Sequence, residues 1–409
     1  MNIFGALRLP RSVLFGSGQR RAIGTVTTRL GRRALLCTDA RLSSTPEFLE
    51  IVADLAREGV EVRVYDQTQP DLPIESIQDC VEQVRDFEAE VVLGIGGGSC
   101  MDLAKVVAVM LTHGGDIRSY YGEFAVPGPV KPLIAVPTTA GTGSEVTPVA
   151  VIADSERGAK IGIASPHIIP MVAVCDPELT FTCPPALTAC SGADALTHAV
   201  EAFTTLARPV DAMLTQQHVF VGKNALSDHF AKLAVASIWK GLRRAYEDGS
   251  DTEAREALMM GALAAGCAFG TAGTAAAHAL QYPVGNLTHT AHGDGVATLL
   301  PFVMQFNRSA CVPAFAELAR LVGVGQPGDD EEALSQRFID AVADLLASVG
   351  IPRSLRELGL ADDQRGYVAE HSLAAARLVK NNPRPLDLAA MQSITDAAYA
   401  GDRARLLAI

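Results

Sequence analysis

Residues 89–105 read AEVVLGIGGGSCMDLAK, and this stretch decides the fold. A fully apolar run, Val91–Ile95, leads into the glycine turn Gly96–Ser99, and helical periodicity begins at Met101. A strand that passes through glycines into a helix directs the first backbone N–H groups of the helix at one place, where they can bind an anion. Without Cβ atoms a pyrophosphate can approach closely, although a glycine cluster alone can be no more than a turn. In this context we expect the turn Gly96–Ser99 to bind phosphate.

Short apolar runs alternate with amphipathic stretches throughout the first half of the chain. The expected strands are RALLCTD, VEVRVYD, AEVVLGIGGGS and PLIAVPTT, and helical patterns lie near 45–58, 74–87 and 101–111. This alternation predicts an α/β domain with a Rossmann-like parallel sheet. Such sheets bind ligands beyond the carboxyl ends of their strands, which here are Asp39, the glycine turn and Thr138–Gly143.

Two of these strand ends add polar groups that suit a dinucleotide. The segment 137–145, PTTAGTGSE, offers hydroxyls for ribose or phosphate, although taken alone it is better explained by an ordinary loop with a helix cap at Ser144. Asp39 can accept a hydrogen bond from a ribose 2′-OH and would repel a 2′-phosphate, which favours NAD over NADP. The alternative for Asp39 is a cap on the next segment.

The second half of the chain has a different character. After about residue 185, Ala-rich helical patterns replace the strands, which predicts an all-α domain. We expect a dinucleotide-binding α/β domain over 1–182 and a helical metal-binding and substrate domain over 183–409, with the proline-rich segment Pro177–Pro185 as the hinge.

Composition excludes several classes of protein. The 409 residues carry a formal net charge of −12, which argues against nucleic acid and anionic membranes as partners and favours a small-molecule ligand. The eight cysteines include no CxxC pair, so we expect free thiols in a reducing cytoplasm. The beginning of the chain lacks the features of a secretory signal. The apolar stretch Met259–Leu280 is rich in Ala and Gly, which favours a packed interior helix over a membrane span.

Histidines gather in two segments of the helical half. Asp194 and His198 lie four residues apart in CSGADALTHAVEAF, so on a helix their side chains project one turn apart from one face. The segment AHALQYPVGNLTHTAHGDG contains His278, at the end of a small-residue helix, and His289 and His292, beyond an expected Pro/Gly loop. If that loop folds back, one Asp and three His would form a four-ligand site for Fe²⁺ or Zn²⁺. Each histidine taken alone could be an ordinary structural residue.

The segments GGGSCMDLAK, PTTAGTGSEVT, GADALTHAVEAF and HALQYPVGNLTHTAHG, in this order and spacing, closely resemble the iron-containing (group III) alcohol dehydrogenase family. The resemblance runs over essentially the whole chain. It implies a Rossmann-like domain, a helical domain and a divalent metal in the cleft between them. It also implies metal binding by Asp194, His198, His278 and His292, phosphate binding by Gly97, Gly98 and Ser99, cofactor contacts from Thr138, Thr139, Thr142 and Lys160, and NAD selection by Asp39.

One position departs from the family pattern. Many members carry a further histidine four residues after the third ligand, thought to serve proton transfer, and this chain has Tyr282 there. A phenol with an ordinary pKa near 10 is a poorer base at neutral pH, so Tyr282 is either a catalytic residue or a packing aromatic. His289 is expected to be a bystander.

We therefore expect a cytoplasmic, metal-dependent, NAD-linked oxidoreductase that interconverts an alcohol and an aldehyde or ketone, with Fe²⁺ bound or alternatively Zn²⁺. The family is commonly dimeric or larger, so a homo-oligomer is expected. The rival interpretations are a zinc glycerol or polyol dehydrogenase, a lyase like dehydroquinate synthase and a non-catalytic NAD-binding redox sensor. A metal-independent relative, such as a maleylacetate reductase, is disfavoured by the complete ligand set.

Overall fold

The computed structural model describes residues 3–157 and 159–407, which form two compact units. The α/β unit comprises Arg8–Thr182 together with Thr215–Val219, and the helical unit comprises the rest of the described chain. An α/β unit with a parallel sheet and a separate helical unit confirm the predicted fold class.

A six-stranded parallel sheet forms the centre of the α/β unit. The strand order is β1-β9-β6-β4-β2-β3. The strands are β1 (Ser12–Phe15), β2 (Arg33–Cys37), β3 (Glu61–Tyr65), β4 (Val91–Gly96), β6 (Leu133–Pro137) and β9 (Val172–Cys175). Gly96 pairs with Pro137 at the carboxyl ends of β4 and β6, so the segments that follow these two strands leave the sheet side by side.

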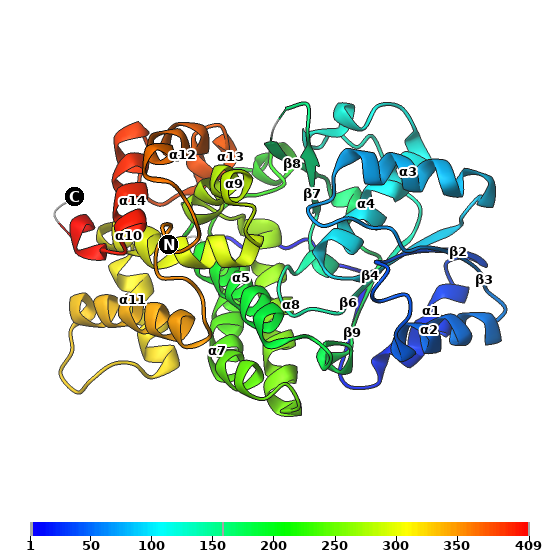
Figure 1. The fold of residues 1–409 in the computed structure, drawn as a ribbon, viewed down its shortest axis with the longest axis horizontal. Coiled ribbons are helices and arrows are strands. Elements are labelled where there is room, and N and C mark those ends of the chain that lie inside the picture. Colours follow the sequence, from blue (N-terminus) through cyan, green and yellow to red (C-terminus); the bar gives the residue numbers. More distant parts are fainter. Residues whose placement is uncertain (1–2, 158, 408–409) are drawn as a thin grey trace. The chain divides into compact units, whose positions relative to one another are not determined.

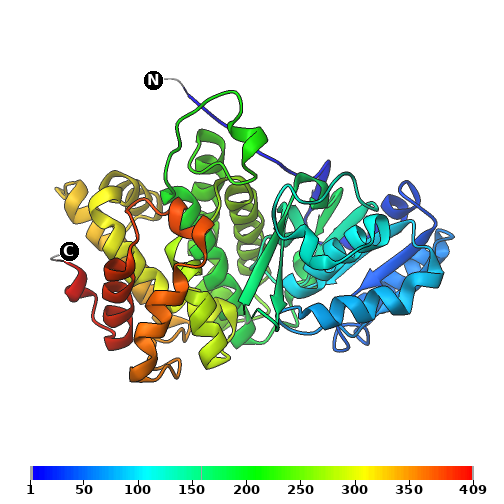
Figure 2. The same cartoon turned by 90° about the horizontal axis from the view of Figure 1, so that it is seen from above.

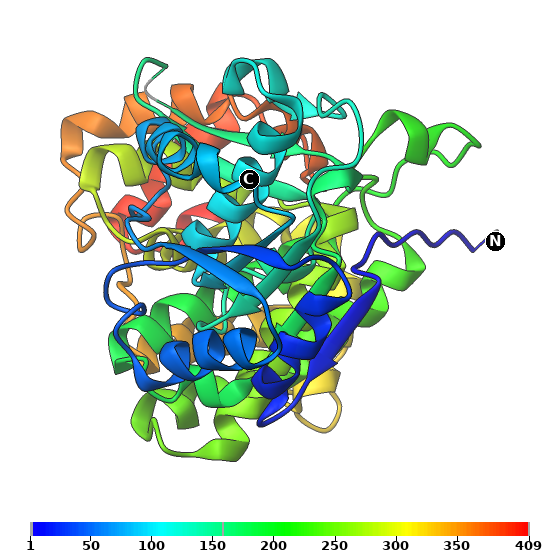
Figure 3. The same cartoon turned by 90° about the vertical axis from the view of Figure 1, so that its right-hand side faces the viewer.

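Helices cover both faces of this sheet, as Figures 1 and 3 show. The helices are α1 (Ile23–Thr28), α2 (Pro46–Arg57), α3 (Ile74–Val84) and α4 (Gly98–His113). Side chains alternate along the strands: Leu35 and Val92 pack in the core that includes α3 and α4, and Leu36 and Leu93 pack in the core that includes α1 and α2. Every residue of β4 is buried, which explains its continuous apolar sequence.

A second, three-stranded sheet was not predicted. It consists of β5 (Gly122–Glu123), β8 (Ala159–Ala164) and β7 (Val149–Asp154), in that order, and β7 and β8 pair antiparallel. Figure 2 shows β7 and β8 as two long adjacent arrows. The strands β1 and β9, each of four residues, were also missed, because runs this short give almost no periodic signal.

The helical unit is built from long helices with small residues at their contacts. They are α5 (Pro185–Thr204), α6 (Leu214–Gln217), α7 (Ala225–Glu247), α8 (Thr252–Ala272), α9 (Ala276–Thr288), α10 (His292–Val322), α11 (Glu331–Ser348), α12 (Arg365–Ser372), α13 (Ala376–Asn381) and α14 (Leu388–Ala400). The helices α5, α7 and α8 pack on one another. A Cβ atom on Gly241 would come within 2.7 Å of the Ala254 carbonyl oxygen, so glycine permits the close approach of α7 and α8.

The apolar stretch Met259–Leu280 forms parts of two buried helices where one was expected. The helix α8 ends at Ala272, Gly273 has φ +84°, and α9 begins at Ala276. Among the described residues no single helix has the length and apolar composition of a membrane span; α8 and α9 meet that test only as a pair, bent by 103°. Both helices are largely buried in the helical unit. In α8 the buried side chains run from Leu258 to Ala272 with few exceptions, and in α9 those of Ala276–Gln281 are buried.

Candidate metal centre and cofactor site

One face of α5 carries three buried polar side chains. Asp194, His198 and Glu201 are spaced four and three residues apart, so they lie along one side of the helix. Their exposed fractions are 3%, 6% and 2%. The ring of His198 stacks on Phe269 of α8, with ring centroids 4.2 Å apart, which restricts the orientation of this imidazole. Charged side chains are seldom buried without a partner or a metal, so this face of α5 marks a site.

Two further histidines converge on Asp194. His278 is the third residue of α9 and His292 is the first residue of α10, and only three residues, His289 to Ala291, separate these helices. The Oδ1 atom of Asp194 lies 3.6 Å from Nε2 of His198, 3.8 Å from Nε2 of His278 and 3.8 Å from Nε2 of His292. All three predicted histidine ligands therefore approach the same carboxylate oxygen of Asp194. His289 is exposed at the left-handed end of α9.

The local structure around these histidines differs from the expectation in two respects. His278 lies at the start of a separate helix, and residues 281–288, expected as a Pro/Gly loop, continue α9. Pro283 inside a helix removes one backbone donor, but Pro283 and Val284 are both buried, and such packing can maintain a helix that propensity alone disfavours.

The donor atoms of Asp194, His278 and His292 lie within 4.8 Å of one another, so these three residues could hold a metal ion, whereas His198 approaches the same carboxylate oxygen without belonging to this mutually close group. In a tetrahedral site with bonds of about 2.1 Å the donor atoms lie about 3.4 Å apart, close to the separations measured from Asp194. The Nε2 atom of His278 is buried and receives no hydrogen bond from the described residues. A carboxylate oxygen and imidazole nitrogens are ligands for Fe²⁺ and Zn²⁺ alike.

Glu201 is a buried residue beside the candidate ligands that the sequence did not lead us to expect. Its Oε2 atom lies 2.6 Å from Nδ1 of His278, and its carboxylate accepts hydrogen bonds from the backbone N–H groups of Ala275 (2.9 Å) and Ala277 (2.7 Å). The signal in the sequence is the position of Glu201 three residues after His198, on the same face of the helix. An acidic residue there, in an otherwise apolar helix, could have been identified as a partner of the ligands.

Tyr282 lies one turn beyond His278 in α9 and is half-buried. It packs against a hydrophobic cluster of the helical unit that includes Leu280 and Met391. Burial raises the pKa of its phenol, which makes the phenolate a still scarcer base at neutral pH. The surroundings of Tyr282 favour packing over proton transfer, and its catalytic role stays a prediction.

The glycine turn begins α4 as expected. Gly96 has φ +149° and a Cβ atom there would come within 2.6 Å of Sγ of Cys100, so only glycine fits this position. A Cβ atom on Gly98 would come within 2.8 Å of Cγ2 of Thr142. The glycine turn and the loop Thr138–Gly143, which we call the threonine loop, are therefore in direct contact. Gly97, at the N-cap of α4, lies beside Thr139. The N-terminus of a 16-residue helix with this open cradle suits a pyrophosphate.

The other predicted cofactor contacts have these surroundings. Asp39 accepts hydrogen bonds at Oδ1 from the N–H groups of Arg41 and Leu42, as the capping alternative requires, while its Oδ2 lies 3.9 Å from Sγ of Cys100. A pocket next to Thr138 is also lined by Leu42, Phe48 and Leu179. Lys160, in β8, forms an ion pair of 2.6 Å with Asp71. Ser99 lies in the first turn of α4.

A buried polar cluster connects α4 with the threonine loop, and it too was missed by the sequence analysis. Nζ of Lys105 donates to Oγ of Ser144 (2.8 Å), Oγ1 of Thr147 (3.2 Å) and the carbonyl of Val149 (2.7 Å). Ser144 in turn donates to Asp102 at 2.6 Å. Burial lowers the pKa of Lys105 to about 8. On the neighbouring acid burial acts in the opposite direction and raises the pKa of Glu145 to about 7.

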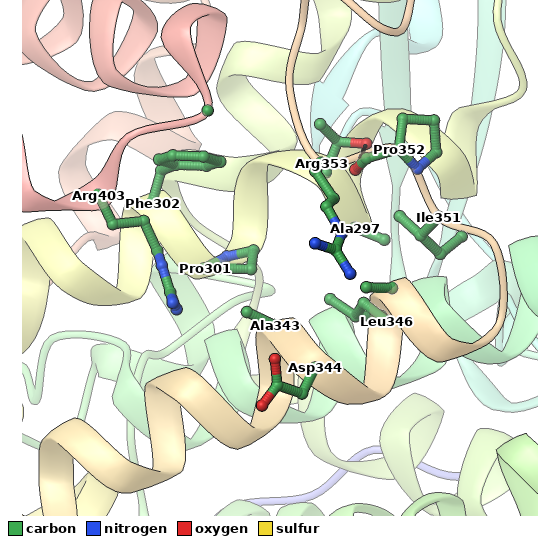
Figure 4. Close-up of a pocket in the computed structure, with 13 residues that line it drawn as sticks. Ala297, Pro301, Phe302, Ala343, Asp344, Leu346, Ile351, Pro352, Arg353 and Arg403 are labelled. Atoms are coloured by element: carbon green, nitrogen blue, oxygen red, sulfur yellow. Dashed lines mark hydrogen bonds between the residues drawn. The ribbon is translucent and has the colours of Figure 1, made fainter.

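A cavity of about 190 Å³ in the helical unit is separate from the candidate metal centre. It lies between α10, α11 and residues 351–353, and Figure 4 shows Arg353, Arg403 and Asp344 among its lining side chains. None of the four candidate ligands lines this cavity. It is therefore not the place where the converging histidines would act.

The chain is similar to known proteins over nearly its whole length. Residues 10–177 match the family model described as iron-containing alcohol dehydrogenase, and residues 188–399 match the model of the C-terminal part of that family. Long-chain-alcohol dehydrogenase 1 of Geobacillus thermodenitrificans is 36% identical over 377 residues, which span 91% of each chain. The crystal structure of a 1,3-propanediol oxidoreductase has a TM-score of 0.90 with 32% identity, covering 97% of this chain and 100% of that one. Sulfoacetaldehyde reductase from Bifidobacterium kashiwanohense, solved with NAD⁺, has a TM-score of 0.82 with 27% identity, covering 98% of this chain and 100% of that one.

Proposed function

Because the chain belongs to the iron-containing alcohol dehydrogenase family, it is an NAD-linked alcohol dehydrogenase or aldehyde reductase, and we propose that its metal is bound by Asp194, His198, His278 and His292. The observation that carries this proposal is the convergence of the three imidazole Nε2 atoms within 3.8 Å of one buried carboxylate oxygen. A site built only to stabilise the fold would not gather four metal-ligand side chains, three of them buried, around one carboxylate oxygen.

We infer that Fe²⁺ is the resident metal and that Zn²⁺ can replace it, because the donor set suits both ions. When bound, the metal supplies a Lewis acid that lowers the pKa of an alcohol oxygen or polarises a carbonyl. The chain itself holds the donor atoms in place. Helix α5 presents Asp194 and His198 from adjacent turns, and stacking on Phe269 restricts the ring of His198.

NAD is the proposed hydride carrier, bound by the α/β unit. Gly97, Gly98 and Ser99 at the start of α4 would hold the pyrophosphate with backbone N–H groups. The contacts expected from the threonine loop and from β8 are those of Thr138, Thr139, Thr142 and Lys160. Asp39 would favour NAD over NADP through Oδ2, since its Oδ1 already accepts two backbone hydrogen bonds.

Tyr282 is the remaining candidate for proton transfer, and we propose that it shapes the apolar wall beside the ligands. The raised pKa of its phenol supports this assignment. The variant Tyr282→Phe removes the hydroxyl and keeps the ring, so kcat should stay within about threefold of the wild-type value. A loss of kcat of about 100-fold or more, of the size expected from removing a general acid or base, would instead assign it to proton transfer.

We further propose a homo-oligomer, dimeric or larger, in a reducing cytoplasm. All eight cysteines are free thiols and seven of them are buried, which suits such a compartment. Sedimentation of the purified protein would measure the oligomeric state directly.

The experiment that tests the proposed function is metal analysis of anaerobically purified protein, combined with a screen of alcohols and aldehydes against NAD and NADP. His278→Ala should weaken metal binding so far that the purified variant carries no metal, although added Zn²⁺ still binds weakly, and it should lose more than about 100-fold of the activity, since a ligand and its contact with Glu201 are both removed. His289→Ala is the matched control, because His289 is exposed, and it should keep both metal and activity. Retained metal in His278→Ala with a tenfold or smaller loss of activity would refute the assignment.

A further inference from the structure

Glu201 lies directly behind one of the candidate ligands, and we propose that it is a positioning residue that orients His278 for the metal and docks the start of α9 onto α5. This inference rests on the proposed function, since it concerns the same metal site. Glu201 itself is not a ligand: the imidazole of His278 lies between its carboxylate and Asp194, with Nδ1 2.6 Å from Glu201 and Nε2 3.8 Å from Asp194.

The first effect of Glu201 is on the tautomer of His278. An ionised carboxylate only accepts hydrogen bonds, so the contact of 2.6 Å places the proton of a neutral imidazole on Nδ1. The lone pair is then on Nε2, the atom that faces Asp194 and that has no hydrogen-bond partner among the described residues. A carboxylate behind a ligating histidine also raises the basicity of that ligand.

The second effect is on the position of α9. Ala275 is the N-cap of this helix and Ala277 lies in its first turn, where backbone N–H groups have no partner within the helix. Both donate to Glu201, at 2.9 and 2.7 Å, and the negative charge also lies at the positive end of the helix dipole. Because His278 follows in the same turn, one carboxylate fixes both the backbone and the ring of this ligand.

A glutamine cannot replace this carboxylate. The three donors, two backbone N–H groups and Nδ1–H, are divided between two acceptor oxygens, with Ala277 on Oε1 and the other two on Oε2. An amide offers one oxygen, and its NH₂ group would face a donor. Glu201→Gln is therefore expected to weaken metal binding by about 10–100-fold, the usual effect of losing an outer-shell partner of a ligand.

The test is a double-mutant cycle on the full-length protein, with metal affinity as the measured quantity. Metal-free protein is titrated with Zn²⁺ in competition with a chromophoric chelator, for the wild type, Glu201→Gln, His278→Ala and the double variant. If Glu201 acts through His278, Glu201→Gln costs about 10–100-fold in the wild-type background and less than about threefold in the His278→Ala background. A purely structural role would give the same loss in both backgrounds, and that result would overturn the proposal.

Two further variants complete the design. Glu145→Gln also replaces a buried carboxyl group by an amide, but in the α/β unit, and should leave Zn²⁺ affinity unchanged. Glu201→Asp keeps the carboxylate but shortens the side chain by one methylene group. This variant should fold even if Glu201→Gln does not, with a Zn²⁺ affinity between those of the wild type and Glu201→Gln. Wild-type affinity in Glu201→Asp together with Glu201→Gln would refute the positioning role alone. Failure of the wild-type protein to bind Zn²⁺ or Fe²⁺ would refute the metal site itself.

Discussion

Replacing Lys105 by methionine is expected to loosen the cofactor site from a distance. Lys105 lies two turns into α4, with 1% of its surface exposed, and makes no contact that we assign to the cofactor. Its ammonium group ties α4 to the segment that follows the threonine loop, through Ser144, Thr147 and Val149. Methionine has a similar length but provides no donor, so the change removes the charge and leaves the volume nearly unchanged.

The expected cost follows from what is left behind. Asp102 is partly buried, with 14% of its side chain exposed, its Oδ1 lies 3.8 Å from the lysine Nζ, and desolvation already raises its pKa. Removing one member of a buried charged pair typically costs about 3–5 kcal/mol, because the other charge stays buried without compensation. The two hydroxyls and the carbonyl also lose a charged donor. We therefore expect the free energy of unfolding of the α/β unit to fall by about 3–5 kcal/mol.

Two measurements separate this effect from a general loss of stability. Hydrogen exchange of peptides from 98–113 and 144–154 reports the α/β unit, while the single tryptophan, Trp239 in α7, reports the helical unit by fluorescence. Lys105→Met should speed exchange in both peptides, leave the unfolding transition of Trp239 in place and weaken NADH binding about tenfold. Lys131→Met is the control, because no hydrogen bond of the Lys131 side chain is found among the described residues. Wild-type exchange rates and NADH affinity in Lys105→Met would refute the reasoning.

Three other variants test separate parts of the structure. In Gly293→Ala the new Cβ would come within 2.2 Å of the Cys190 carbonyl oxygen, so α10 must shift away from α5 and Zn²⁺ affinity should fall at least tenfold. Gly366→Ala is the control: nothing lies within 4 Å of its new Cβ, so its Zn²⁺ affinity should match the wild type. Burial raises the pKa of Glu145 to about 7, so from about pH 4.3, its value in an unfolded chain, up to pH 7 the folded protein holds a proton that the unfolded chain has released. Stability of the α/β unit should therefore fall with rising pH over this range, by about 3 kcal/mol at most, and Glu145→Gln should flatten that slope in urea titrations. Asp39→Gly should raise kcat/KM with NADP relative to NAD at least tenfold, and an unchanged ratio would remove Asp39 from cofactor selection.

The parts of the fold that the sequence predicts well are those with strong local signals. The strand Val91–Gly96 is apolar at almost every position, and the helix after it begins at a glycine turn whose backbone geometry few residues allow. In α5 the spacing of Asp194 and His198 is a local property of one helix, so their proximity could be predicted without tertiary information.

Other features depend on contacts that no local pattern encodes. The break between α8 and α9 occurs in a stretch of Ala, Gly and Thr that would suit one continuous helix. It is maintained by Gly273 and by the hydrogen bonds that the start of α9 donates to Glu201. Pro283 and Gly285 would ordinarily indicate a loop, yet tertiary packing keeps this segment helical. The partnership of Lys105 with Ser144 joins residues 39 positions apart and becomes visible only when both are found buried.

The break between α8 and α9 also explains how a helix start comes to lie beside the candidate ligands. A continuous helix through 259–288 would have satisfied the N–H groups of residues 275 and 277 internally, and they could not have bound a carboxylate. By ending α8 at Ala272, the chain exposes a new set of unpaired donors in its interior, where a buried negative charge is the natural partner. Glu201 supplies that charge and in return gains three donors, so its burial is offset before any metal binds. The same arrangement leaves Nε2 of His278 without a hydrogen-bond partner among the described residues, and a buried nitrogen of this kind is stabilised most by a cation shared with Asp194.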